Sequence, residues 1–285
     1  MRLTIPMRLF KLRSSFYLLK FVMPAVIPLS QDQILTELAP ELQAVLQQIY
    51  IFPSLASTNT WLLEQPNTCF SVCLAEEQTA GRGRRGRTWQ SPNSGNIYFS
   101  LRWCFQVVPA NYGCLSLVVG VVVAEALAAY GLQGQMLKWP NDIYYQGQKL
   151  GGILLQTTQP LQQVVIGIGL NTGMQRATVT TIDQAWCDLS EILEQNIDRN
   201  RLIAAILKQL IPALQAFPRF NMADFQQQWQ RWDWLTDQAV RIDTGKEILQ
   251  GRACGLDEQG QLQVALADGS RRAFSSADVS VRQVS

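Results

Sequence analysis

The stretch Gly81-Arg82-Gly83-Arg84-Arg85-Gly86 alternates glycines with arginines, and it follows an apolar run at 72–75 that predicts a buried strand. Glycine lets a loop bring its backbone N–H groups close to a ligand, and each guanidinium offers a fork of donors to anionic oxygens. The spacing matches neither a P-loop, which needs Gly-Lys-Ser/Thr, nor a dinucleotide-binding fingerprint. Taken alone, the run is compatible with a phosphate-binding loop, a solvated basic turn or an RNA contact.

A second segment, Lys138-Trp139-Pro140-Asn141-Asp142, puts a lysine at the end of a predicted strand. Pro140 disfavours helical geometry for the residue before it, so the chain leaves the strand in an extended form. A mostly buried ammonium at this position needs an anionic partner. Two interpretations follow from the residues alone: Lys138 is a structural lysine in a salt bridge, or it meets a substrate carboxylate and the acyl phosphate made from it.

Two further segments place glycine pairs in predicted strands. They are Lys149-Leu150-Gly151-Gly152-Ile153-Leu154 and Gly167-Ile168-Gly169-Leu170-Asn171. Glycine weakens a strand, so its presence there indicates that a ligand or a neighbouring element approaches the backbone closely. Taken separately, each segment fits simple packing as well as ligand contact.

The pattern of apolar residues divides the chain into an α+β part and an all-β tail. Helices are predicted at 31–46, 60–64, 116–130, 201–217 and 222–234, and strands at 49–52, 72–75, 96–103, 136–139, 151–157 and 164–170. Short strands at 239–242, 247–256, 261–265 and 271–275, separated by turn residues, predict a small β-barrel. We therefore expect a partly disordered N-terminal extension with one helix at 1–44, a main domain at 45–236 and a barrel domain at 237–285.

The composition restricts the possible chemistry. With 285 residues and 47% hydrophobic side chains, the chain is long enough to bury one large core. A net charge of +2 is too balanced for a protein that coats nucleic acid. The chain contains no histidine, which excludes catalytic triads, metal sites and general bases that depend on this residue. Any metal should be a hard cation held by carboxylate and phosphate oxygens.

The six cysteines form no Cys-x-x-Cys pair and show no disulfide framework. We therefore expect reduced, partly buried thiols, as is usual in a reducing cytosol. Cys69 and Cys73 fall in a segment that reads as one strand, and their spacing would place both on the same face.

The N-terminal stretch 1–31 is basic and contains an apolar cluster at 16–27. A targeting segment and an upstream extension with Met23 as the functional start are both compatible with it, and we favour an extension with little order. A lysine and a proline interrupt the cluster, which argues against a membrane span. The apolar run at 115–127 is short and contains Glu125. We expect no membrane association.

Read together and in order, these segments resemble the catalytic domain of biotin–protein ligases, the biotin–[acetyl-CoA-carboxylase] ligase or holocarboxylase synthetase family. The resemblance covers about residues 50–236, and its most specific motifs are the Gly/Arg run and Lys138–Asp142. The predicted barrel is similar to the small SH3-like domain of this family. The resemblance implies an α+β fold, with a mixed-sheet catalytic domain of the biotin/lipoate ligase type followed by the SH3-like barrel.

The resemblance also implies roles for individual residues. Lys138 and Arg84 are expected to be catalytic, in contact with the reacting carboxylate and the α-phosphate, while Arg85 is expected to face solvent. The residues expected to bind biotin are Ser57, Thr58, Asn59, Gln78, Arg82, Gly83, Arg84, Lys138, Gly151 and Gly152. The residues expected to bind the nucleotide are Arg84, Trp89, Asn141, Lys149, Asn171 and Arg282. No residue is assigned to a metal.

The activity that the resemblance implies has two steps. Biotin and ATP, with Mg²⁺, form biotinyl-AMP and release pyrophosphate, and biotin then passes to a lysine of the biotin carboxyl carrier protein of acetyl-CoA carboxylase. The attacking carboxylate is already ionised, so the chemistry needs no histidine base. An exposed adenylate would hydrolyse, and we therefore expect the Gly/Arg run to be a mobile lid over it. We expect a cytoplasmic protein that is a monomer or a homodimer.

Two alternatives remain. Lipoate–protein ligases resemble this fold and use the same adenylation, but that family carries a Gly-rich stretch leading to a His-Asp pair, which a chain without histidine cannot supply. The other alternative is a nucleic-acid-binding protein that uses the arginine loop. Some biotin ligases carry an N-terminal DNA-binding domain, yet the residues before the catalytic segment predict only one clear helix here. That is too little for a three-helix module, so we expect no sequence-specific DNA binding.

Overall fold

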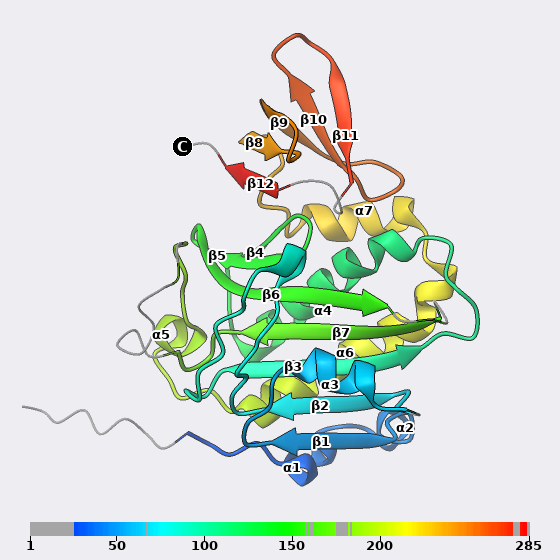
Figure 1. Cartoon of the computed structure of the whole chain (residues 1–285), viewed down its shortest axis with the longest axis vertical. Helices are drawn as coiled ribbons and strands as arrows, with labels where there is room; N and C mark the ends of the chain where they lie inside the picture. Colours follow the sequence, from blue (N-terminus) through cyan, green and yellow to red (C-terminus); the bar gives the residue numbers. More distant parts are fainter. Residues whose placement is uncertain are drawn as a thin grey trace, which may run out of the picture.

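The computed structural model describes residues 26–66, 68–157, 159, 162–174, 182, 184–275 and 280–283, and of the last four only Val281 with its side chain. The expectations about residues 1–25, including a start at Met23, lie outside this range. Within the described residues, the chain forms a seven-stranded mixed sheet with helices and a five-stranded antiparallel sheet (Figure 1). The predicted α+β class is confirmed.

The large sheet has the strand order β1-β2-β3-β7-β6-β5-β4. Its strands are β1 (Gln48–Phe52), β2 (Ser71–Ala75), β3 (Ile97–Cys104), β4 (Gln135–Lys138), β5 (Asp142–Tyr145), β6 (Gln148–Thr157) and β7 (Gln163–Leu170). β1 and β2 pair in parallel, and the other neighbours pair antiparallel. The apolar strands β2 and β7 lie in the middle of the sheet and are almost wholly buried, as their composition predicts.

The two faces of this sheet are covered by different helices (Figure 1). On one face, α4 (Leu115–Tyr130) packs against α6 (Arg199–Ala216) and places Gly120 beside Ile153 of β6. On the other face, α3 (Thr58–Glu64) rests on β2, β3 and β7. By length and composition, Tyr112–Tyr130 is the one described helix apolar enough to cross a membrane, but 67% of that window is buried inside the protein, as in a core helix.

The N-terminal helix prediction is wrong in one respect. The segment expected as one helix at 31–46 forms two short helices, α1 (Gln31–Thr36) and α2 (Pro40–Gln43). Pro40 cannot continue a helix and holds Ala39 in extended geometry, with ψ of 149°, so the helix must end and restart. The remaining helical elements are α5 (Leu189–Leu193), α7 (Met222–Gln230) and the 3₁₀ turns η1 (Arg84–Gly86), η2 (Tyr112–Cys114) and η4 (Phe217–Arg219).

The predicted strands after residue 237 form the second sheet, in the order β11-β10-β9-β8-β12. They are β8 (Ala239–Asp243), β9 (Ile248–Leu256), β10 (Leu262–Leu266), β11 (Arg271–Phe274) and β12 (Ser280–Gln283). The indole N–H of the buried Trp139 donates to the carbonyl of Gly260, in the β9–β10 turn, over 3.1 Å. This contact ties the small sheet to the larger one; the domain boundary at 236 stays a prediction.

The expectation of six reduced cysteines is wrong. Cys69 and Cys104 form a disulfide, with their Cα atoms 5.6 Å apart, and the other four cysteines are thiols. The pairing of β2 with β3 sets Ser71 opposite Arg102, so Cys69, two residues before β2, meets Cys104, the last residue of β3. Cys69 also precedes β2 and does not share a strand face with the buried Cys73.

Candidate functional site

One row of cross-strand partners runs across five strands of the large sheet. From β3 to β4, the row is Tyr98, Gly169, Gly152, Asp142 and Lys138. All five residues line the same cavity, which has a volume of about 700 Å³. That size suits a small-molecule site. The row therefore forms the floor of the candidate site. Lys138, the first residue of the motif Lys138–Asp142, lies at one end of it.

The glycines of this row make room for an indole. A Cβ on Gly169 would lie 2.7 Å from the indole of Trp89, and one on Gly152 would lie 3.5 Å from it. The ammonium of Lys149 stands 5.4 Å from the Trp89 ring centroid. Of the two interpretations of the glycine pairs, close approach of a neighbouring element therefore explains Gly169, and Trp89 in turn lines the cavity.

Gly151 and Gly152 serve different purposes, because successive residues of a strand face opposite sides of the sheet. Gly152 lines the cavity, whereas Gly151 is not among the lining residues. A Cβ on Gly151 would collide with the side chain of Leu170 and approach that of Ile143 at 3.2 Å, both part of the core on the other face. Of the two glycines expected to wall the biotin pocket, the structure places Gly152 at the cavity and turns Gly151 toward the core.

At the α3 end of the cavity, a buried polar network surrounds the start of the helix. Gln78 accepts hydrogen bonds from the N–H and hydroxyl of Thr58, at 2.9 and 3.1 Å, and donates to Ser91 at 2.9 Å. The Ser100 hydroxyl lies 2.7 Å from that of Thr58 and 2.6 Å from Oδ1 of Asn59. Ser57, Thr58, Asn59 and Gln78 all line the cavity, as the resemblance implies. The supporting residues Ser91 and Ser100 were not predicted to belong to the site.

Local sequence explains how this network is held. Ser57 caps α3, its hydroxyl accepting from the N–H of Thr60 at 3.4 Å, which directs the next two side chains toward the sheet. Asn59 donates to the carbonyl of Leu154 at 3.3 Å and to the side chain of Gln156 at 3.0 Å. A side chain on Gly167 would overlap with the Asn59 amide, so this glycine is needed for packing.

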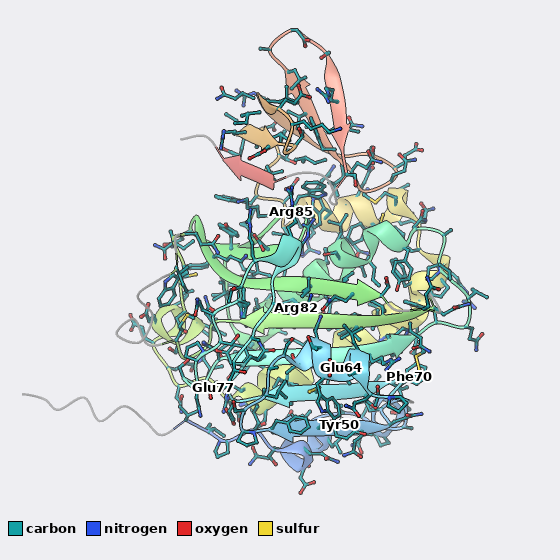
Figure 2. All side chains as sticks on the ribbon, viewed as in Figure 1. Tyr50, Glu64, Phe70, Glu77, Arg82 and Arg85 are labelled. Atoms are coloured by element: carbon teal, nitrogen blue, oxygen red, sulfur yellow. A yellow bond between two sulfur atoms is a disulfide. The ribbon has the colours of Figure 1, made fainter. Side chains whose placement is uncertain are left out.

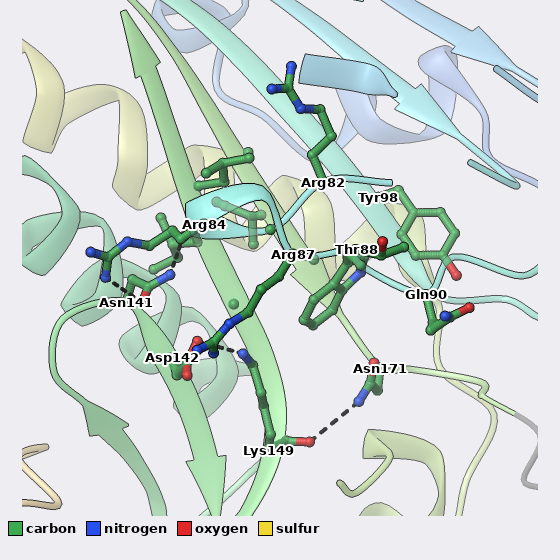
Figure 3. A pocket seen from close by; sticks show the side chains of 18 of the residues that line it. Arg82, Arg84, Arg87, Thr88, Gln90, Tyr98, Asn141, Asp142, Lys149 and Asn171 are labelled. Atoms are coloured by element: carbon green, nitrogen blue, oxygen red, sulfur yellow. Dashed lines mark hydrogen bonds and ion pairs between the residues drawn. The ribbon is translucent and has the colours of Figure 1, made fainter. Parts of the chain in front are cut away.

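The arginines after β2 point in different directions (Figure 3). Arg84 reaches Asn141 and donates to its Oδ1 over 3.1 Å. Arg82 points away from Asp142 and Lys149, whereas Arg87 points toward them. Arg82 and Gly83 line the cavity, so each residue expected from the run is present at the site. Arg87 lines it as well and was missed, although it directly follows the Gly/Arg run.

Arg85 differs from its neighbours in backbone and direction. Its φ is 56°, in the left-handed region that only some residues tolerate. Its guanidinium approaches Gly245, in the β8–β9 turn of the small sheet, and Figure 2 shows it between the two sheets while Arg82 lies over the large one. Arg85 is exposed, as expected, yet it also belongs to the lining of the cavity.

The cavity is strongly cationic. Among the described lining residues are six cations and a single carboxylate, Asp142, which is paired with Lys149 at 2.7 Å. Burial lowers the pKa of Arg84; the nearby Asp142 opposes this shift, and the charges of Arg85 and Arg87 add to it. Such an excess of cations suits a ligand with several negative charges. One ion-paired carboxylate does not make a metal centre, and the described residues contain no cluster of three metal-ligating side chains.

Lys138 stands among aromatic rings at the end of β4. Its Nζ is 3.4 Å from the hydroxyl of Tyr144, 5.1 Å from the centroid of that ring and 5.8 Å from that of Trp234. The two rings stack on each other at 4.7 Å. Trp234 comes from the connection to the small sheet, and this connection runs along β4. The main-chain N–H of Trp234 donates to the carbonyl of Leu137 at 2.9 Å. Neither ring was predicted to be part of the site.

Of the three remaining residues expected to bind the nucleotide, Asn141 and Asn171 lie at the cavity, and Arg282 is not described with its side chain. The Asn141 amide donates to the carbonyl of Ile153 at 2.6 Å, and the Asn171 amide donates to that of Cys187 at 3.1 Å; both residues line the cavity. Arg282 belongs to β12, but its side chain lies outside the described residues. Its neighbour Val281 lines the cavity, so β12 does reach the site.

Comparison with known proteins adds independent findings. Residues 51–171 match the model of the biotin/lipoate A/B protein ligase family, and residues 236–282 match that of the biotin protein ligase C terminal domain. Over 239 residues the chain is 37% identical to the bifunctional ligase/repressor BirA of Escherichia coli, covering 82% of this chain and 74% of that protein. It is 31% identical over 246 residues to a biotin–[acetyl-CoA-carboxylase] ligase of Mycobacterium tuberculosis, covering 81% and 87%.

Solved structures give the same result. The structure of a biotin protein ligase from Aquifex aeolicus in complex with biotin and ATP matches with a TM-score of 0.74 at 28% identity. The match covers 84% of this chain and 100% of that one. The fold of most of this chain is thus shared with a protein whose structure contains biotin and ATP.

Proposed function

The chain belongs to the biotin protein ligase family, and on that premise we propose that its cavity binds biotin and ATP, makes biotinyl-AMP and transfers biotin to a carrier lysine. The carrier that we propose is the biotin carboxyl carrier protein of acetyl-CoA carboxylase, the enzyme in the name of the mycobacterial relative. The observation that carries the proposal is one cavity with an uncharged hydrogen-bonding end at Thr58 and Gln78 and a cationic end at Lys138 and Arg84.

The two ends match the two parts of the substrates. The ureido ring of biotin is neutral and has both donors and acceptors, as do the side chains around α3. The carboxylate of biotin must approach the α-phosphate of ATP, and two anions meet only where positive charge offsets their repulsion. Lys138 and Arg84 stand where they can neutralise both groups and align them for in-line attack. Mg²⁺ would come with ATP and would offset part of the charge of its phosphates; Asp142, the one carboxylate of the described cavity lining, is paired with Lys149.

The second step needs little further chemistry from the protein. The neutral amine of the carrier lysine attacks the acyl carbon of biotinyl-AMP, and the acyl–phosphate bond breaks. AMP leaves with its negative charge balanced by Lys138 and Arg84, and the proton that the amine loses passes to water. The Gly/Arg run covers the adenylate until the carrier arrives, which limits attack by water. The leaving phosphate needs no protonation, and water accepts the proton from the amine, so the absence of histidine is compatible with both steps.

The direct test is mass spectrometry of a purified carrier domain after incubation with the protein, biotin and MgATP. The expected result is one added biotinyl group on one lysine, absent when that lysine is changed to arginine or when Lys138→Ala replaces the wild-type enzyme. Lipoate in place of biotin provides the second arm. Modification with lipoate and none with biotin would overturn the proposal in favour of a lipoate ligase.

We further propose that the protein acts in the cytoplasm, as a monomer or a homodimer, without binding specific DNA sequences. In support, α1 packs against α6 and β1, and Leu42 of α2 packs against the same core, so these two helices do not form a separate module. The relative from Escherichia coli is named a ligase/repressor, so the point needs a test. Sequence-selective, nanomolar binding to DNA in a gel-shift assay would contradict it, and light scattering with biotin and ATP would give the oligomeric state.

A further inference from the structure

Five of the predicted ligand-binding residues lie in a single long connection. Residues 77–95, here called the cap loop, join β2 to β3 and include Gln78, the Gly/Arg run and Trp89. Glu76 precedes the cap loop and Asn96 follows it. The β2–β3 pairing sets Ala75 opposite Tyr98, so Glu76 and Asn96 lie just beyond the last pair of the ladder, at the base of the cap loop.

A single buried arginine from α6 contacts both of these residues. Nη1 of Arg199 donates to Oε2 of Glu76 at 2.5 Å and to the main-chain carbonyl of Asn96 at 3.3 Å. Nη2 donates to Oε1 of Glu76 at 3.1 Å, which makes the ion pair bidentate. Arg199 is 1% exposed. Removing one partner of such a pair leaves an uncompensated charge in the interior, so the contact is costly to break.

The same arginine holds a strap of upstream chain, Val26–Ser30. Nη2 of Arg199 donates to the carbonyl of Ile27 at 2.7 Å, and the N–H of Leu29 donates to Oε1 of Glu76 at 3.2 Å. Asn200, the next residue of α6, donates to the carbonyl of Pro28 and accepts from the N–H of Ser30, both at 2.9 Å. The methyl groups of Val26 pack against Gly95, the last residue of the cap loop.

On the other side, Asn96 extends the contact to the far wall of the cavity. Its Oδ1 accepts from the N–H groups of Thr172 and Gly173 at 3.0 and 3.1 Å, and these residues directly follow Asn171. Its amide donates to the hydroxyl of the cavity-lining Tyr98 at 3.0 Å. Arg199, Glu76 and Asn96 themselves are not among the lining residues, so their effect on a ligand must be indirect.

We propose that Arg199 and Glu76, covered by the strap Val26–Ser30, form a clasp that fixes both ends of the cap loop and thereby sets how tightly the loop holds biotinyl-AMP. The inference rests on the proposed function for its ligand, and it makes Arg199 and Glu76 positioning residues. A loop whose ends are held loses less conformational freedom when it closes, so a firm clasp favours the closed state. A loosened clasp should release the adenylate sooner while the core of the protein stays folded.

The experiment compares Arg199→Lys with a matched control, Arg102→Lys, in the full-length protein. Arg102 is also buried and donates to the carbonyls of Leu62 and Gln65 and to Thr68, none of which belongs to the cap loop. The first readout is trypsin cleavage within the cap loop well below the unfolding temperature, since the loop offers several arginines. The second is the rate at which preformed biotinyl-AMP leaves the protein, measured after rapid removal of free ligand.

For Arg199→Lys we expect cleavage in the cap loop and release of biotinyl-AMP to be faster by about tenfold, the effect of losing one hydrogen bond between charged groups. Arg102→Lys should leave both rates close to those of the wild type. The proposal is overturned if Arg199→Lys lowers only the melting temperature and leaves both rates unchanged. It is also overturned if Arg102→Lys changes the two rates as much as Arg199→Lys does. Should Arg199→Lys not fold, Glu76→Gln, which keeps an acceptor for Leu29 but loses the charge, must show the same two effects.

Failure of the proposed function would look different. If the wild-type protein makes no biotinyl-AMP, the function is wrong, but trypsin cleavage of the ligand-free variants still decides whether Arg199 controls the cap loop. If the wild type makes biotinyl-AMP and neither variant at the clasp affects the loop, only the clasp is wrong.

Discussion

Nη1 of Arg84 donates to Oδ1 of Asn141 over 3.1 Å, joining two motifs that are 57 positions apart in the chain. Asn141 is itself held by a bond from its amide to the carbonyl of Ile153 at 2.6 Å. The Gly/Arg run is therefore seated directly on the Lys138–Asp142 segment. This contact places the Arg84 guanidinium at the cationic end of the cavity, where the reacting groups of biotin and ATP should meet.

Arg84→Ala should weaken the retention of biotinyl-AMP. The substitution removes a charge and a donor from the lid, and we expect release of the intermediate to rise by about 10- to 100-fold. Leaked adenylate would then modify lysines of bulk protein, detectable by avidin blotting of added albumin. Arg84→Lys keeps the charge but loses the forked donors of the guanidinium. Its rate of biotinyl-AMP release should lie between those of the wild type and Arg84→Ala. Undetectable leakage with normal transfer to the carrier would count against this role.

Lys138→Ala should nearly abolish adenylation and leave the fold intact. Loss of a cationic group at the reacting centre costs about 100-fold or more in rate. Biotin-dependent exchange between pyrophosphate and ATP measures the step directly, with circular dichroism as the control for folding. Tyr144→Phe removes only a hydroxyl 3.4 Å from the ammonium and should cost far less. Near-normal exchange by Lys138→Ala would show that the lysine is structural.

Gly169→Ala should impair nucleotide binding by displacing an aromatic ring. The new methyl group would lie 2.7 Å from the Trp89 indole, which must move into the cavity. We expect KM for ATP to rise by about tenfold, corresponding to about 1.4 kcal/mol. Gly120→Ala, in α4, is the matched control, because its methyl group meets ordinary contacts of 3.5 Å or more. Equal KM values for the two variants would contradict the assignment of Trp89 to the nucleotide.

The disulfide between Cys69 and Cys104 should contribute measurably to stability. It closes a loop with a sequence separation of 35 residues. The chain-entropy model gives about 3–4 kcal/mol for a loop of this length. Urea unfolding should therefore show a lower midpoint for Cys104→Ser than for the oxidised wild type, and reductant should lower only the wild type. Midpoints that do not respond to reductant would mean that the two thiols are unlinked in solution.

Cys73 should resist alkylation in the folded protein. Burial raises the pKa of its thiol to about 12, so at pH 8 the reactive thiolate is almost absent. Iodoacetamide at pH 8 should label the partly exposed Cys254 and spare Cys73, as read by peptide mass spectrometry. In denaturant both should react. Rapid labelling of Cys73 under native conditions would contradict the buried position of β2.

Local sequence was sufficient for the α+β class and for most elements, because continuous apolar runs such as those of β7 and α4 are typical of elements buried on all sides. The motifs were also sufficient to select the cavity, since Thr58, Gln78, Arg84 and Lys138 all line it. The break between α1 and α2 has a local cause, Pro40, that the helix prediction overlooked, whereas the disulfide was missed because it joins distant segments. The disulfide at Cys69 depends on the β2–β3 register, which the positions of the cysteines alone do not reveal.

The site itself was decided by the tertiary structure. Tyr98, Gly169, Gly152, Asp142 and Lys138 form one row only because four antiparallel pairings bring them into line, and a register shift of one residue would turn each of them to the opposite face. The alternation along β6 also separates Gly152, in the cavity, from its sequence neighbour in the core. The Gly/Arg run was recognisable from its residues, but the seat that it takes on Asn141 and the clasp at Arg199 exist only in the folded chain, where segments far apart in sequence meet.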